Sequence, residues 1–278
     1  NWATGFDVWT PGEAGAKQAL RDFLPLLAGY DGARNLPSVV GTSRLSPHIH
    51  WGEISPATIW HIASRECGAQ AEPFLRELGW RDYATNLLDQ MPDYHRANGK
   101  QPYDLFPWRD DAEADVDFTA WTMGKTGYPI VDAGMRELWA TGWMHNRVRM
   151  IAASFLIKHL LVDWRRGEQW FWDTLVDADG GANAANWQWV AGTGVDAPLF
   201  SRIMAPLSQS EKFDAAAYIR KWVPELAGVS EPYIHDPDEF GVRPRDYSAK
   251  LIGHRAARER ALAAMQLMRE LRLHLSDD

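Results

Sequence analysis

The sequence predicts an all-α fold. From Gly15 onward, apolar residues recur at spacings of three and four, as in Ala19, Phe23, Leu26 and Leu27, and this spacing places them on one face of an α-helix. Segments in which apolar and polar residues alternate are hard to find, so little indicates β-strands. Of the 278 residues, 46% are hydrophobic and 24% are charged, which is the composition of a globular protein.

The first 14 residues differ from the rest of the chain. They lack an initiator Met and include Pro11 and Gly12 ahead of the first helical run, a combination that breaks regular structure. We interpret residues 1–14 as the remnant of a linker, and we expect residues 15–278 to form one helical domain.

Further helices are indicated by their starts and by their periodicity. We expect a serine to cap a helix and a proline to occupy its first turn at Ser46-Pro47 and again at Ser55-Pro56. The periodicity predicts a helix that includes Glu77, a long helix over residues 145–162 and a last helix over residues 254–275.

Three connections stand out between these helices. Residues 93–117 are polar and acidic, and we expect a solvated surface loop there, apart from Trp108. Residues 177–186 are rich in Gly, Ala and Asn, so that their backbone can approach a ligand closely. Residues 231–239 form a second irregular acidic stretch.

Charge and cysteine content exclude several classes of protein. The net charge of −8 argues against a protein that coats nucleic acid with its whole surface, although a local basic groove stays possible. The single cysteine, Cys67, excludes an intrachain disulfide, a four-cysteine zinc site and a cysteine-bound iron–sulfur cluster. We expect no metal site and a reducing, cytoplasmic location. The apolar stretch 150–157 ends at Lys158, too early for a membrane span, which needs about 20 residues.

Tryptophan is unusually abundant, with 15 Trp against 8 Tyr and 10 Phe. Core packing explains most of them, because an indole buries a large area. The other interpretation is that some stack on a flat ligand or carry electrons. Glu77, Trp80 and Arg81 lie at i, i+3 and i+4, so one helix face presents an acceptor, a ring and a cation; a half-exposed salt bridge beside a packed indole is the alternative.

Positive charge gathers between residues 145 and 166. Five Lys or Arg stand there against one acid, Asp163, and we expect this run to form a phosphate-facing groove, with a solvated cationic helix face as the alternative. The five are Arg147, Arg149, Lys158, Arg165 and Arg166. Within the run, Asn146, Arg149 and Met150 share one helix face.

Residues 42–46 place three hydroxyls and Arg44 at a helix entrance. Unpaired backbone N–H groups and the helix dipole make such an entrance favourable for an anion such as a diphosphate. A simple helix cap is the alternative.

Seven segments, taken in chain order, resemble the photolyase/cryptochrome family. They are 41–46 (GTSRLS), 77–81 (ELGWR), 125–132 (KTGYPIVD), 141–150 (TGWMHNRVRM), 163–167 (DWRRG), 186–189 (NWQW) and 211–214 (EKFD). The resemblance covers about residues 24–226 and implies the helical FAD-binding domain of a cyclobutane pyrimidine dimer photolyase of class I or class III type. The family's N-terminal α/β antenna domain has no counterpart in this chain, so no antenna chromophore is expected on it.

The resemblance implies a cofactor, FAD, active as FADH−, with Asn183 beside flavin N5. The residues implied for cofactor binding are Tyr30, Thr42, Ser43, Arg44, Leu45, Ser46, Phe74, Arg149, Asp177, Ala178, Asp179 and Asn183. An electron-transfer chain is implied for Trp187, Trp164 and Trp108.

The resemblance also implies a substrate, DNA that contains pyrimidine dimers, repaired by light-driven electron transfer to a flipped-out dimer. Glu77, Asn183 and Met150 are the implied catalytic residues. The residues implied for DNA binding are Arg34, Glu77, Trp80, Arg81, Asn146, Arg147, Met150, Trp189, Arg202, Gln209 and Lys212. The alternative is a cryptochrome-type blue-light receptor that binds FAD without repair. We expect a monomer.

Overall fold

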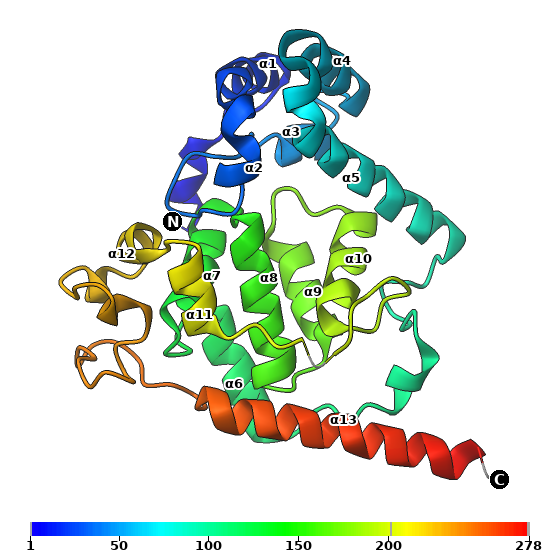
Figure 1. Ribbon diagram of the computed structural model, residues 1–278, viewed down its shortest axis with the longest axis vertical. Coiled ribbons are helices and arrows are strands. Elements are labelled where there is room, and N and C mark those ends of the chain that lie inside the picture. Colours follow the sequence, from blue (N-terminus) through cyan, green and yellow to red (C-terminus); the bar gives the residue numbers. More distant parts are fainter. Residues whose placement is uncertain (1, 201, 277–278) are drawn as a thin grey trace.

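A computed structural model describes residues 2–200 and 202–276. Within these residues every regular element is helical, which confirms the all-α prediction. Figure 1 shows a group of helices at the centre of the molecule. They are α7 (Pro129–Thr141), α8 (Asn146–Ser154), α9 (Trp164–Thr174) and α10 (Gly180–Ala191).

The remaining helices surround this centre. On one side lie α1 (Glu13–Phe23), α2 (Tyr30–Ala33), α3 (Ser46–His50), α4 (Pro56–Cys67) and α5 (Glu72–Gln90). These helices have an apolar cluster of their own, separate from the main core. On the other sides lie α6 (Ala112–Thr122), α11 (Pro206–Lys212), α12 (Ala216–Trp222) and the long α13 (His254–Ser276). Helix α5 also packs against α10, which joins the two parts of the fold.

Short 3₁₀ helices connect these elements. Their bounds are Trp2–Val8, Leu24–Gly29, Gly68–Ala71, Gln101–Leu105, Pro224–Leu226 and Tyr233–His235. Residues 2–8 contact α7, and the indole N–H of Trp9 donates to the carbonyl of Thr141 over 2.8 Å. A Cβ on Gly5 would meet the carbonyl oxygen of Ala140 at 1.8 Å, so the backbones touch. This part of the segment interpreted as a linker therefore packs on the helical core.

One of the two expected serine caps is correct and the other is wrong. Ser55 precedes α4 and accepts a hydrogen bond from the N–H of Thr58. Ser46 is already inside α3, where Leu45 is the N-cap residue and no side chain caps the helix. The Ser46 hydroxyl donates instead to Asp177.

Two length predictions also need correction. The expected surface loop 93–117 is wrong over its last six residues, because α6 begins at Ala112 with Asp111 accepting from the N–H of Ala114. The acidic residues that indicated a loop are therefore the cap and first turn of a helix, where negative charge is favourable. The helix expected over 145–162 continues beyond α8 only as a π-helical turn, Phe155–His159. The expected helix over 254–275 is confirmed as α13.

The π-helical turn contains a buried lysine. Lys158 is 2% exposed and donates through Nζ to the carbonyl of Arg202 over 2.8 Å. Burial, and secondarily the charge of Arg202, lowers the pKa of Lys158 to about 7 from its ordinary value of 10.5.

This lowered pKa predicts how stability depends on pH. Between pH 7 and 10.5 the unfolded chain binds more protons at Lys158 than the folded protein does. The lysine therefore makes the free energy of unfolding rise with pH across that window, by at most about 1.4 kcal/mol per pH unit. Below pH 7 both states are protonated and the dependence disappears.

We expect the free energy of unfolding of Lys158→Met to rise less steeply than that of the parent protein between pH 7.5 and 9. Urea unfolding at several pH values measures the difference in slope. Parallel curves for the two proteins would contradict the assignment.

Candidate functional site

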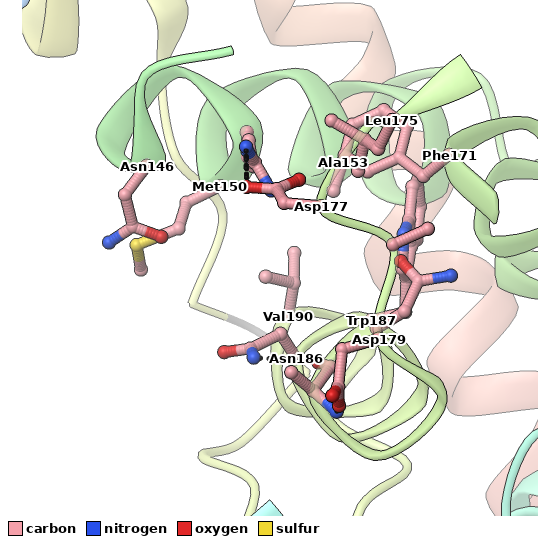
Figure 2. Close-up of a pocket in the computed structure, with 14 residues that line it drawn as sticks. Asn146, Met150, Ala153, Phe171, Leu175, Asp177, Asp179, Asn186, Trp187 and Val190 are labelled. Atoms are coloured by element: carbon pink, nitrogen blue, oxygen red, sulfur yellow. Dashed lines mark hydrogen bonds and ion pairs between the residues drawn. The ribbon is translucent and has the colours of Figure 1, made fainter. Parts of the chain in front are cut away.

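A cavity with an empty volume of about 560 Å³ opens between α8, α9 and α10. Figure 2 shows Met150 and Asp177 on one side of it and Asp179 and Asn186 on the other. The lining residues are Asn146, Arg149, Met150, Ala153, Phe171, Leu175, Asp177, Ala178, Asp179, Ala182, Asn183, Asn186, Trp187 and Val190.

An ion pair stands at one wall of the cavity. Arg149 donates two hydrogen bonds to Asp177, over 3.1 and 2.9 Å, and the side chain of Asp177 is only 3% exposed. The hydroxyl of Ser46 donates to the same carboxylate over 2.6 Å. The hydrogen bond from Ser46 ties the 42–46 segment to the cavity, so the structure brings together three residues that the sequence predicted for one site.

The rest of the 42–46 segment is turned sharply. Arg44 has a φ of 51°, a left-handed conformation that is uncommon for residues other than glycine. Its guanidinium lies 4.5 Å from the ring centroid of Trp143. The Ser43 hydroxyl accepts from the N–H of Leu45, which is buried. The arginine is thereby directed away from helix α3.

Seven of the twelve predicted cofactor residues do not line the cavity, namely residues 42–46 and two buried aromatic residues. Tyr30 and Phe74 are buried in the α1–α5 cluster, with their ring centroids 5.5 Å apart. Burial raises the pKa of Tyr30 to about 12, so its hydroxyl stays protonated. In the structure these two side chains support the wall that carries α5.

Asn183 lies on the first turns of α10 and has a defined amide orientation. Its Nδ2 donates to the backbone carbonyl of Glu168 over 3.0 Å and to Glu168 Oε1 over 2.9 Å. Both donors are therefore used. Among the described residues nothing donates to Asn183 Oδ1, so this oxygen is the group that Asn183 can offer to a ligand.

One face of α5 carries three of the predicted residues, of which Arg81 contacts the cavity lining. Glu77 forms an ion pair of 2.6 Å with Arg34, which ends α2. Arg81 pairs over 3.4 Å with Asp179, whose other oxygen caps α10 by accepting from Ala182. Trp80, between them, is 55% exposed. The expected local pair between Glu77 and Arg81 is replaced by these longer-range pairs.

Arg34, Arg147 and Arg202 form what we call the arginine cluster. Burial lowers the pKa of Arg147, and the charges of Arg34 and Arg202 lower it further, so both of these cations act on Arg147. Arg147 is held by Asn35, whose Oδ1 accepts over 2.7 Å. The cluster combines charges from three separate segments of the chain.

Aromatic rings lie beneath these cations. Arg202 stands 5.8 Å from the ring centroid of Trp189. Arg147 and Lys212 both lie over Phe213, at 4.6 and 5.4 Å from its centroid. These contacts place the end of α11, with Gln209 one turn earlier, beside the arginine cluster.

The basic groove predicted from residues 145–166 is wrong in its composition. Only Arg147 joins the arginine cluster. Arg149 pairs with Asp177 and Lys158 is buried, while Arg165 and Arg166 pair with acids. The π-helical turn and the start of α9 rotate these side chains to different sides, so adjacency in sequence does not become adjacency on the surface.

The three tryptophans of the expected electron-transfer chain are placed as follows. Trp187 lines the cavity and contacts Phe171 and Trp121, with ring centroids 4.9 and 6.3 Å away. Trp164 is fully buried and donates to Asn98. Trp108 packs on Phe106 at 4.3 Å. Among the described rings no direct contact joins Trp187 to Trp164, and the chain stays a prediction.

Several functional candidates were missed from the sequence. Asn186 and Val190 follow Asn183 by three and seven residues on the same face of α10, a spacing that could have identified them. Phe171 and Leu175 line the cavity from α9 and the connection after it. Glu168 carries no sequence signal, because its role depends on the packing of α9 against α10.

None of the helices among the described residues combines the length and the apolar character that crossing a bilayer requires.

Comparison with known proteins agrees with this geometry. The family described as the FAD binding domain of DNA photolyase matches residues 74–267. A protein named deoxyribodipyrimidine photo-lyase from Agrobacterium fabrum is 51% identical over 95% of this chain and 58% of its own length. The solved structure of a bacterial class III photolyase from Agrobacterium tumefaciens superposes with a TM-score of 0.90 at 50% identity, over 97% of this chain and 58% of that one.

Cryptochromes are also relatives. Cryptochrome-1 of Sinapis alba is 42% identical over 83% of this chain and 48% of its own length. The chain thus spans about half to three-fifths of the proteins it matches. By its sequence and its fold, the chain belongs to the photolyase family and contains that family's FAD-binding domain.

Proposed function

We propose that this domain, with FAD bound in its fully reduced form FADH−, repairs cyclobutane pyrimidine dimers in DNA under light. The observation that carries the proposal is that the cavity and the arginine cluster lie next to each other. A cavity with a free amide oxygen and a fixed ion pair opens beside the arginine cluster. The cavity suits a flavin, and the cluster suits a phosphate backbone.

The cavity residues fit an isoalloxazine ring. Phe171, Leu175 and Val190 offer apolar surface, while Arg149 and Asn183 offer a donor and an acceptor at fixed positions. Small-molecule sites typically combine an apolar lining with a few fixed polar groups. Bound FADH−, once excited by light, supplies the electron that opens the cyclobutane ring, chemistry that no side chain provides.

Asn183 and the Arg149–Asp177 pair act on the cofactor side. In our proposal Asn183 Oδ1 accepts the N–H at flavin N5, a proton that only the reduced ring carries. The arginine and its partner hold the wall next to the diphosphate-binding segment 42–46. The protein thereby favours the active redox form without placing a charge at N5.

Glu77, Met150, Trp80 and Trp189 act on the substrate side. The dimer must leave the duplex to reach the cavity, a step known as base flipping for photolyases in general. Stacking on the two indoles would return about 1 to 3 kcal/mol per base. Glu77 would hydrogen-bond the dimer edge, with Arg34 holding its carboxylate in place over 2.6 Å.

The relatives named cryptochromes leave a second function, a blue-light receptor that binds FAD without repair. A repair assay separates the two. Protein reconstituted with FAD and reduced in the dark is illuminated with oligo(dT) that contains dimers, and the recovery of thymine absorbance is followed.

We expect recovery that depends on light and on reduction of the flavin. A protein with stoichiometric FAD that shows no recovery would favour the receptor. A protein that binds no FAD would exclude both functions.

A further inference from the structure

The buried ammonium of Lys158 lies in the core, away from the cavity lining, yet it bonds to a residue of the arginine cluster. Its Nζ donates to the backbone carbonyl of Arg202 over 2.8 Å and lies 5.4 Å from the ring centroid of Phe200. Both partners belong to the segment between α10 and α11. The lysine is therefore a tether between the core and that segment.

Contacts with several parts of the fold hold this segment, and near its start Val195 donates to Tyr94. Its described residues, 192–200 and 202–205, form no helix, and loops without secondary structure are generally more mobile than the elements they connect. Phe200 is fully buried, and the N–H of Met204 lies 3.5 Å from Ser154 Oγ at the end of α8. Lys100 donates to the carbonyls of Gly192 and Ala197 at the start of the segment, whereas Lys158 is the charged side chain that donates to Arg202 itself.

The other end of Arg202 faces the proposed substrate. Its guanidinium lies over Trp189 and close enough to Arg147 for the charges to act on each other. A shift of the Arg202 backbone would move this guanidinium relative to both. Mutual repulsion among the cations favours such a shift unless the backbone is held.

We propose that Lys158 is a positioning residue that fixes the backbone of Arg202, so that its guanidinium meets a DNA phosphate beside Trp189. The inference rests on the proposed repair function. An amine suits this task, because its N–H groups donate in either protonation state, and below pH 7 the protonated donor makes the stronger bond. An apolar side chain of the same length would fill the space and leave the carbonyl of Arg202 without its partner.

The test compares the variants Lys158→Met, Arg202→Ala and their combination with the parent protein, all loaded with FAD. Affinity for a duplex with one thymine dimer is measured in the dark at several salt concentrations. Repair is measured under light at saturating DNA and on the free dimer dinucleotide, which lacks flanking phosphates.

We expect Lys158→Met to weaken duplex binding by about tenfold or more, the effect of one hydrogen bond to a charged group. The slope of log affinity against log salt should fall by about 0.9, as for one lost phosphate contact. The rate at saturating DNA and repair of the dinucleotide should not change. In a protein that already carries Arg202→Ala, adding Lys158→Met should weaken duplex binding little further, because both substitutions act through the same guanidinium.

Arg166→Met is the matched control. It removes the same charge from the same run, but Arg166 pairs with Asp115 at the start of α6, so duplex affinity should stay close to that of the parent. Should Lys158→Met fail to fold, Lys158→Gln is measured instead; because its amide can still donate to the carbonyl of Arg202, its duplex affinity should stay closer to that of the parent than the affinity of Arg202→Ala does, and an equal loss in both would contradict the role of the hydrogen bond.

The outcomes separate the two proposals. Unchanged duplex affinity in the Lys158 variant, or an effect that multiplies fully with that of Arg202→Ala, would overturn the positioning role. If Arg202→Ala itself leaves affinity unchanged, the proposed DNA face is wrong and the positioning role falls with it.

Discussion

Asp177→Asn is expected to lose FAD. The substitution keeps the shape of the side chain but removes the charge that faces Arg149, and it weakens the acceptor for Ser46. Breaking a buried ion pair by removing one partner typically costs about 3 to 5 kcal/mol. We expect most of this cost to fall on the FAD-bound state, so that the affinity for FAD drops by about a hundredfold or more. The ratio of flavin to protein absorbance after purification, and titration of the apoprotein with FAD, measure the loss.

Glu225→Gln is the control for this experiment. Glu225 pairs with Arg136 over 2.7 Å, and both side chains are about one-fifth exposed, but neither lines the cavity. We expect this variant to lose some stability and to keep its FAD. Full flavin occupancy in Asp177→Asn would show that the pair supports the fold without holding the cofactor.

The same pair shows what the sequence could predict. Residues 42–46, Arg149 and Asp177 are expected at one site because the family resemblance implies it, and the structure places Ser46, Arg149 and Asp177 in direct contact. The local interpretation of Ser46 as a helix cap was wrong. A cap is inferred from neighbours in sequence, whereas this hydroxyl has a partner 131 residues away.

The basic groove predicted from charge patterning is wrong for a related reason. The run 145–166 was interpreted as one basic groove, yet its cations are divided by a helix end, a π-helical turn and a new helix start. Sequence periodicity assumes that a helix continues regularly, so the change in direction at Phe155–His159 cannot be anticipated from it. The buried position of Lys158 and the pairing of Arg34 with Glu77 follow from tertiary packing alone.

The orientation of Asn183 leads to the second large effect, on the redox potential of bound FAD. Glu168 accepts from Asn183 Nδ2 through both its backbone carbonyl and Oε1, which leaves Oδ1 toward the cavity. An acceptor at N5 favours the reduced ring, which carries N–H there, whereas a donor favours the oxidised ring. Glu168→Ala removes one of the two acceptors and frees the amide to turn its NH2 group toward N5.

We expect Glu168→Ala to make the two-electron potential of bound FAD more negative by about 30 to 60 mV, since about 30 mV corresponds to 1.4 kcal/mol. A dye-coupled reductive titration measures it. Glu168→Gln keeps an oxygen that can accept from Asn183 and should retain the parent potential. In an Asn183→Leu background the Glu168→Ala change should have no further effect, because no amide remains to orient. A parent-like potential in Glu168→Ala would mean that the backbone carbonyl of Glu168 alone fixes Asn183, and that the carboxylate serves only the packing of α9 against α10.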